Sequence, residues 1–242
     1  GSARHWHTLH VYHTTMACLG VPLVISLHSV VGLDFAASLM PGWAETIFPP
    51  YFVVGAMYSG FTMVIVLAAG VRWGLRMQAL ITVEHFEVMA KMLLAASVIM
   101  TLSYAAEWFS AWYGGEHAER RLVAYAFDGD YRVLYWLMLF LNCAIAHAFW
   151  SATARRSVAT VVVIALLINL GMWLERMLIV LNTLSHGYAI GMWRTFAPTL
   201  WDFLLLFGSL GFFALLYLVF CRLLPVVSMH ETRRLLSAEA QQ

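Results

Sequence analysis

Six long apolar stretches constrain the fold of this chain more than any other feature. They cover residues 9–31, 51–71, 79–106, 133–152, 158–184 and 200–224. About 20 consecutive apolar residues are enough for an α-helix to cross the hydrocarbon core of a bilayer. Charged residues make up only 11% of the 242 residues, against about 25% in a typical soluble domain. The sequence therefore predicts an all-α integral membrane protein with about six transmembrane helices in a bundle arrangement.

Signatures of several other protein classes are missing from the sequence. The formal net charge is +1, which gives no basic footprint for nucleic acid. Cys18, Cys143 and Cys221 lie far apart, without the spacing of a zinc site or a disulfide framework. No glycine-rich phosphate loop, nucleophile elbow or zinc-protease motif is present. We therefore expect no nucleic-acid partner and no zinc site or disulfide framework built from these cysteines.

The arginines between the spans indicate the orientation in the membrane. One side of the predicted bundle carries Arg4, Arg72, Arg76, Arg155, Arg156, Arg222, Arg233 and Arg234. The other side carries fewer arginines, and acidic residues lie among them. Loops rich in Lys and Arg stay in the cytoplasm. We therefore expect a multi-pass protein of the bacterial cytoplasmic (inner) membrane with both termini of this chain in the cytoplasm.

The first span ends near two groups that can carry a proton. His28 lies about one turn before the predicted end of this span, and Asp34 follows six residues later, in the turn beyond it. Ionisable side chains at membrane depth are rare and usually face a cavity or a partner, which makes them candidates for function. The alternative is that Asp34 only caps the helix and that His28 hydrogen-bonds a neighbouring carbonyl group.

Further ionisable residues lie in or beside the later spans. The candidates for a proton path are His85, Lys91, Glu107, Glu175, Arg176 and Asp202. Glu175 and Arg176 also fit a structural ion pair satisfied across helices, and Asp202 fits a negative charge at a helix N-terminus. Three-residue spacing places His7, His10 and His13 on one helical face. That face is either a metal or haem site or, as we favour, a polar face at the membrane interface.

One stretch resembles a known family. The segment "HSVVGLDFAASLMPGWAETIFPPYFVVGAMYSGF" is similar to the NrfD/PsrC-like membrane subunits, and within them to the ActC subunit of alternative complex III, a bacterial quinol-oxidising respiratory assembly. The segments "HFEVMAKMLL", "SYAAEWFSAWYGG", "NLGMWLERMLIV", "APTLWD" and "FCRLLP" follow in the family's order and extend the resemblance over most of the chain. Family members have further spans before the first segment, so we expect this chain to be the C-terminal part of such a subunit.

The resemblance implies a division of the chain. Residues 1–34 would be the last helix of a first bundle that holds the quinol site, and residues 35–184 would form a second helical bundle. Residues 185–225 would supply a final loop and a terminal transmembrane helix, and residues 226–242 a cytoplasmic tail.

The resemblance also implies a quinol site near the periplasmic face. His28, Ser29, Asp34 and Phe35 would bind menaquinol or ubiquinol, with His28 and Asp34 as the catalytic proton acceptors, because imidazole and carboxylate groups suit that role. Electrons would pass to an iron–sulfur subunit. The other implied partners are multihaem cytochrome c subunits, a paralogous NrfD-like membrane subunit and a terminal oxidase. The chain itself would bind no haem.

Three alternatives stay open on the sequence alone. The chain could be a structural membrane anchor for peripheral redox subunits, without a quinol site of its own. A di-haem cytochrome b-type enzyme would need histidines that face one another, whereas His28, His85 and His147 lie at unlike depths. A transporter would need a pair of broken helices, which the sequence does not indicate.

Overall fold

The computed structural model describes residues 3–40, 42–43, 47–114, 116–186, 191 and 193–224. Among the described residues, the helices long and apolar enough to cross a membrane are Arg4–Ala36, Phe48–Gly74, Val83–Gly114, Arg132–Trp150, Val158–Ser185 and Leu200–Leu223. The predicted all-helical, multi-pass membrane fold is therefore confirmed. The chain divides into two compact units, of which the first comprises Gly1–Leu67 with Val83–Arg194 and the second Ala68–Thr82 with Thr195–Gln242.

The first helix, α1 (Ala3–Ala36), is longer than predicted at both ends. Asp34 therefore lies in the last turn of the helix, not in a turn beyond it. The end of α1 packs on the start of α2 (Phe48–Gly74), where Gly32 allows a close approach. A β-carbon at Gly32 would lie only 2.7 Å from Cα of Pro49. Pro49 itself is tolerated because the first turn of a helix needs no backbone donor there.

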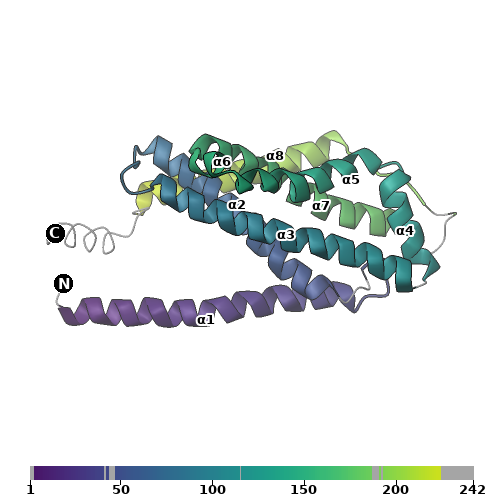
Figure 1. Ribbon diagram of the computed structural model, residues 1–242, viewed down its shortest axis with the longest axis horizontal. Coiled ribbons are helices and arrows are strands. Elements are labelled where there is room, and N and C mark those ends of the chain that lie inside the picture. The colour runs from purple at the N-terminus through teal and green to yellow at the C-terminus, as the bar shows by residue number, and fades with distance from the viewer. Residues whose placement is uncertain are drawn as a thin grey trace. The chain divides into compact units, whose positions relative to one another are not determined.

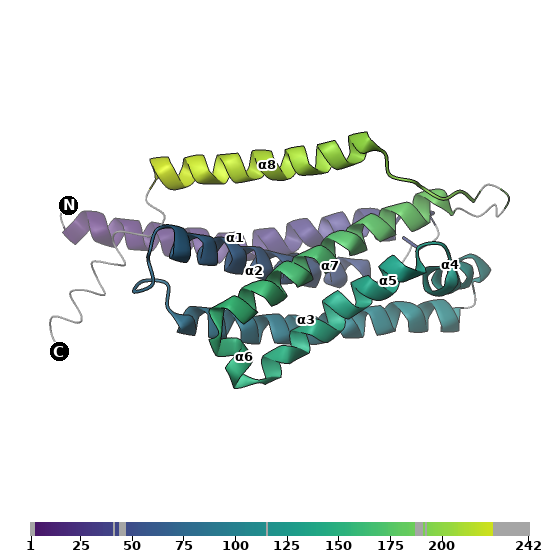
Figure 2. The same cartoon turned by 90° about the horizontal axis from the view of Figure 1, so that it is seen from above.

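The bundle of the first unit contains α3 (Val83–Gly114), α5 (Arg132–Leu139) and α7 (Val158–Ser185). These helices run lengthwise beside one another, and α5 packs closely on α7 (Figures 1 and 2). The third span was predicted to end at residue 106, before the charge of Glu107. The helix instead continues to Gly114, because the carboxylate of Glu107 faces a cavity within the unit and does not end the helix.

A short helix lies where the sequence predicted only a connection between spans. This helix, α4 (His117–Asp128), is amphipathic and buries Leu122 and Ala126. It contacts α3, α5 and α7 at the end of the bundle where α3 ends and α5 begins (Figure 1). It thereby covers part of that end of the unit.

The fourth predicted span is not one regular helix. After α5 the backbone widens into a π-helix, η1 (Phe140–Ala144), and then tightens into a 3-10 helix, η2 (Ile145–Trp150). The N–H group of Ile145 bonds to the carbonyl of Phe140, five residues back. The hydroxyl of Tyr58 donates a hydrogen bond of 3.0 Å to the backbone carbonyl of Asn142. The irregular segment is thus tied to α2 at its centre.

Charged side chains join α3 to the five-residue helix α6 (Ala152–Arg156) at the opposite end of the unit. Glu87 on α3 forms ion pairs of 3.0 Å with Lys91 and 3.1 Å with Arg156, and Arg155 lies 3.9 Å from the same carboxylate. Arg155 also donates to the carbonyl groups of Phe149 and Trp150 at the end of η2. These contacts fix the turn between the fourth and fifth spans.

Apolar and aromatic side chains from all the helices of the bundle form the core. The largest fully buried ones are Tyr58, Ile65, Phe86, Leu93, Met100, Phe149, Val161, Ile168 and Leu178. Because they are spread along α2, α3, η2 and α7, the bundle is packed along its length and not only at one end.

The second unit contains the end of α2, the connection to α3 and the last span, α8 (Leu200–Leu223). Arg72 donates hydrogen bonds to the carbonyl groups of Gln78 and Ile81 and so closes the connection. Asp202 accepts bonds of 2.7 Å from both the N–H and the hydroxyl group of Thr199. This capping box starts α8 and gives Asp202 the structural role considered from the sequence. The predicted tail, residues 226–242, lies outside the described residues.

Candidate functional site

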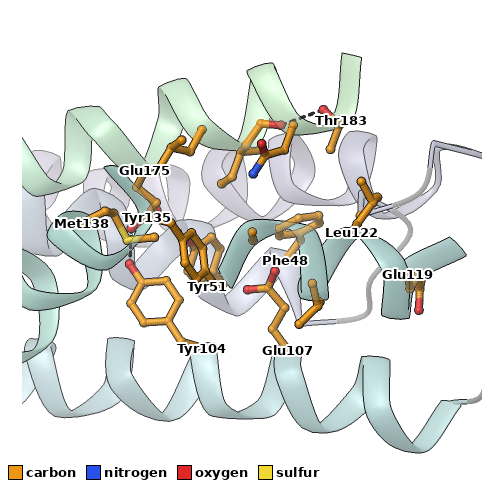
Figure 3. A pocket seen from close by; sticks show the side chains of 16 residues that line it. Phe48, Tyr51, Tyr104, Glu107, Glu119, Leu122, Tyr135, Met138, Glu175 and Thr183 are labelled. Carbon is orange, nitrogen blue, oxygen red and sulfur yellow. Dashed lines mark hydrogen bonds between the residues drawn. The ribbon is translucent and has the colours of Figure 1, made fainter. Parts of the chain in front are cut away.

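A cavity lies at the end of the first unit where α2 and α5 begin and α3 and α7 end (Figure 3). Its volume, taken as the space open to the centres of water-sized molecules, is about 80 Å³. Its lining residues are Gly42, Phe48, Tyr51, Tyr104, Glu107, Glu119, Leu122, Val123, Ala126, Tyr135, Met138, Glu175, Leu178, Ile179, Asn182 and Thr183. Apolar and aromatic side chains form most of the wall, and no basic side chain is among these residues. The polar part of the lining is therefore acidic.

Glu175 on α7 is the most deeply buried charged group of the cavity, with 1% of its surface exposed. The Tyr51 hydroxyl on α2 donates a 2.5 Å hydrogen bond to Oε1 of Glu175, and the Tyr104 hydroxyl on α3 donates to Oε2. A buried carboxylate is stable only when its oxygens are bonded. Side chains from three different helices therefore meet at this one group.

Asn142 supplies a third donor to the same carboxylate. Its Nδ2 atom lies 2.9 Å from Oε2 of Glu175 and 2.9 Å from the hydroxyl oxygen of Tyr104. Asn142 is fully buried and lies in the π-helix η1. Single π-turns within helices occur frequently at functional sites. Here the wide turn carries the amide that completes the bonds around Glu175.

Arg176 compensates the charge of Glu175. Its Nη2 atom lies 3.4 Å from Oε1 of Glu175, and its guanidinium carbon lies 4.5 Å from the ring centre of Phe52 and 5.3 Å from that of Tyr51. Aromatic faces attract a guanidinium group electrostatically. The predicted ion pair between these sequence neighbours is thus present. As the sequence analysis considered, side chains of α2 and α3 complete its contacts from across the bundle.

Glu107 differs from Glu175 because no described residue forms a hydrogen bond or ion pair with its carboxylate. The side chain comes from α3 and points into the cavity (Figure 3). Across the cavity lining, Oδ1 of Asn182 on α7 is buried and likewise has no hydrogen-bond partner among the described residues. The cavity thus offers two groups, the carboxylate of Glu107 and the amide oxygen of Asn182, that can accept a hydrogen bond from a proton donor.

The outer part of the cavity is formed with help from α4. Burial, together with the nearby Glu116 carboxylate, raises the pKa of Glu119 above its ordinary value. On the opposite wall, the Tyr135 hydroxyl accepts a 2.9 Å hydrogen bond from Nε1 of Trp108. Because Trp108 is a donor only, the hydroxyl proton of Tyr135 stays available to another acceptor.

The structure places the predicted quinol residues on the last turns of α1. Nδ1 of His28 lies 2.8 Å from the carbonyl of Val24 in the same helix, which is the local bond considered in the sequence analysis. Asp34 is exposed. Six residues of α-helix separate the two by about 9 Å along the axis and by about 120° around it, so they do not share one face. Ser29, next to His28, is half-buried.

Phe35 joins this part of α1 to the cavity wall. Its ring centre lies 6.4 Å from that of Phe48, 5.2 Å from that of Phe52 and 4.7 Å from that of Trp43. Phe48 lines the cavity and Phe52 lies under Arg176. A group of contacting aromatic rings therefore connects the predicted quinol segment to the cavity wall and to Arg176 beside Glu175.

The six predicted proton-path residues divide into two sets. Glu107, Glu175 and Arg176 come together at or beside the cavity, as described above. His85, Lys91 and Asp202 do not line it: His85 is exposed near the start of α3, Lys91 pairs with Glu87, and Asp202 caps α8. Within the described part of the chain, no group of three or more His, Cys, Asp or Glu side chains is arranged to hold a metal ion.

The sequence analysis missed several members of the site. Tyr51, Tyr104, Asn142 and Asn182 were not proposed as functional residues, although all four line the cavity or bond to Glu175. Asn142 did carry a signal, because it is an amide inside an apolar span. The tyrosines carried none, since tyrosine is common where membrane helices meet the water interface.

Residues 2–186 match the family described as "Polysulphide reductase, NrfD". The chain belongs to the NrfD family. No curated protein matches the chain. NrfD proteins are membrane subunits of quinol-linked redox complexes, and they typically partner with iron–sulfur subunits. The matched residues of this NrfD protein include α1, the whole cavity lining and the hydrogen bonds around Glu175.

Proposed function

We propose that this chain is the quinol-oxidising membrane subunit of a respiratory assembly like alternative complex III, closest to its ActC subunit. Menaquinol or ubiquinol would bind at the end of α1, against His28, Ser29, Asp34 and Phe35. The observation that carries the proposal is the aromatic contact between Phe35 and Phe48. It puts the predicted quinol segment next to a cavity that holds an unbonded carboxylate.

The chemistry requires acceptors for both products of oxidation. A hydroquinone that becomes a quinone releases two electrons and two protons. The electrons would pass to the iron–sulfur cluster of a partner subunit. His28 and Asp34 would take the two hydroxyl protons, because imidazole and carboxylate groups act as general bases. Asp34 is exposed and His28 is half-buried, so a ligand or a partner helix can reach both.

Protons that leave the quinol would then reach the cavity. Glu107 supports this role because its carboxylate faces the cavity without a hydrogen-bond partner among the described residues. Glu175 and its tyrosine partners supply a second protonatable group with O–H groups already bonded to it. His85, Lys91 and Asp202 stay candidates for the remaining part of a path. In this proposal the cavity end of the unit faces the periplasm.

The proposed setting follows from the same assignment. The chain would lie in the bacterial cytoplasmic membrane with both termini in the cytoplasm. Beside the iron–sulfur subunit, its partners would be multihaem cytochrome c subunits, a paralogous NrfD-like membrane subunit and a terminal oxidase. The chain would bind no haem or metal itself, so the redox centres would belong to its partners.

Quinol-oxidation turnover of the purified complex tests the proposal. His28→Ala, Asp34→Asn and Glu107→Gln are made separately, and assembly is checked on a native gel. We expect each variant to lose most of its turnover while the complex stays intact. His10→Ala, on the exposed part of α1, and Asp128→Asn, exposed at the end of α4, serve as matched controls and should retain turnover.

The opposite result assigns a different role. If the His28 and Asp34 variants both turn over quinol at the wild-type rate in an intact complex, the quinol site lies on another subunit. The chain is then the structural membrane anchor for peripheral redox subunits. If the Glu107 variant alone keeps the wild-type turnover, quinol binds at α1 but its protons do not pass through the cavity.

A further inference from the structure

Two glycines lie against the hydrogen-bonded cluster around Glu175, in the interior of the helices α2 and α7. A β-carbon on Gly55 would lie 2.7 Å from Nη2 of Arg176. A β-carbon on Gly171 would lie 2.7 Å from Cβ of Leu141 and would collide with Oδ1 of Asn142. Glycines inside membrane helices let another helix or side chain approach the backbone closely. At both positions the approaching group belongs to the cluster around Glu175.

The space at Gly55 lets Arg176 reach Glu175. Sequence neighbours on a helix point about 100° apart, so the guanidinium group must fold back along the surface of α2 to approach the carboxylate. It does so over the bare backbone of Gly55, between the rings of Phe52 and Tyr51. A β-carbon at position 55 would lie too close to Nη2 for that atom to stay where it is, so the end of the Arg176 side chain would have to move from its position 3.4 Å from Glu175.

The space at Gly171 lets the amide of Asn142 reach Glu175. The amide of Asn142 lies against the backbone of α7 at Gly171, one turn before Glu175. From there its Nδ2 atom reaches both the Tyr104 hydroxyl and Oε2 of Glu175. A side chain at position 171 would push the amide away from α7. Glu175 would then lose a donor on the side opposite Arg176.

We propose that Gly55 and Gly171 are positioning residues for Glu175. Neither glycine touches substrate; each leaves room for one side chain that compensates the negative charge of the buried carboxylate, Arg176 from one side and Asn142 from the other. The two glycines together thus determine how well the negative charge of Glu175 is compensated. This inference rests on the proposed function in one respect: it assumes that Glu175 takes up a proton during turnover.

Infrared spectroscopy of the purified complex tests this inference directly, because a protonated carboxyl group has a carbonyl stretching band that a carboxylate lacks. The band of Glu175 is assigned, in any variant that shows it, by its disappearance when Glu175→Gln is added. Loss of an opposite charge at this distance changes the ratio of protonated to ionised carboxyl by about tenfold or more. We therefore expect Gly55→Ala to increase this ratio for Glu175 by up to about tenfold, and Gly171→Ala to increase it by less.

The chain provides a matched control and a rescue. Gly60 lies on the same helix as Gly55, and a β-carbon there would meet nothing within 4 Å, so Gly60→Ala should leave the band unchanged. In the double variant Gly55→Ala/Arg176→Lys, the side chain at 176 no longer has the Nη2 atom that collides with the new methyl group. We expect this pair to lower the protonated fraction relative to Gly55→Ala alone.

Each remaining outcome overturns the inference. If Gly55→Ala and Gly171→Ala assemble and give the band of Gly60→Ala, the glycines do not position the donors of Glu175. If Gly55→Ala does not assemble and the double variant does not restore assembly, Gly55 serves helix packing and not Arg176. Quinol turnover tests the proposed function separately. A Glu175→Gln variant with normal turnover would refute proton uptake at Glu175, but the infrared comparison would still show whether the glycines position Arg176 and Asn142.

Discussion

Replacement of Glu175 by alanine removes the group on which three helices converge. The change leaves the hydroxyls of Tyr51 and Tyr104 without their acceptor in a buried place, and the amide of Asn142 keeps only its bond to the hydroxyl oxygen of Tyr104. A buried donor without a partner destabilises a protein by about 1–3 kcal/mol, whereas hydrogen bonds inside membrane proteins average nearer 0.6 kcal/mol, roughly, because other partners are found. We therefore expect the free energy of unfolding to fall by about 2–4 kcal/mol.

Thermal unfolding of the purified complex in mild detergent, followed by tryptophan fluorescence, measures this loss. For a chain of this length, 1 kcal/mol corresponds to about 2–4 °C in Tm, so Glu175→Ala should lower Tm by roughly 4–16 °C. Glu175→Gln keeps the shape and one carbonyl oxygen, and should lower Tm by less than half as much. Equal shifts for the two variants, or an alanine variant as stable as the wild type, would refute the claim that these hydrogen bonds hold the bundle together.

Three smaller predictions concern charges away from Glu175. The pKa of Glu119 is raised above its ordinary value of 4.5, so the folded protein holds this proton more tightly than the unfolded chain. The folded protein therefore loses stability as the pH rises through the raised pKa. Glu119→Gln should flatten that part of a plot of Tm against pH. Glu87→Gln should lower the free energy of unfolding only slightly, because the side chains of Lys91 and Arg156, its two nearest partners, are mostly exposed, and urea titration checks this. Asp202→Ala removes the capping box at Thr199 and should lower the Tm slightly, which thermal unfolding of the complex checks.

The sequence predicted the spans well because hydropathy and length alone determine which helices can cross a bilayer. It also found Glu107, Glu175 and Arg176, since charge inside an apolar run is conspicuous. It misplaced the end of α3, because Glu107 was taken as a boundary when its carboxylate faces a cavity. It missed α4, whose apolar side chains are too few for a span and are buried only against neighbouring helices.

The cluster around Glu175 could not be predicted for a different reason. Tyr51, Tyr104 and Asn142 lie between 33 and 124 residues from Glu175 in the chain, and only the packing of the helices brings them together. The same holds for Gly55 and Gly171, because the side chains that approach them come from other helices: Arg176 on α7 approaches Gly55, and Asn142 in η1 approaches Gly171. Spacing along one helix carries no information about such contacts.

The π-helix at Phe140–Ala144 makes the length of this chain matter as well as its composition. A π-turn adds one residue to a helix, so the side chains after it are rotated by about 100° from the places that an uninterrupted α-helix would give them. Removal of one residue here would restore α-helical spacing and turn the buried side chains of Ala146 and Phe149 away from the core, even if every side chain of the site were kept. Substitution of the exposed Phe140 is thus better tolerated than a single deletion between residues 140 and 144, which would misalign the rest of the span.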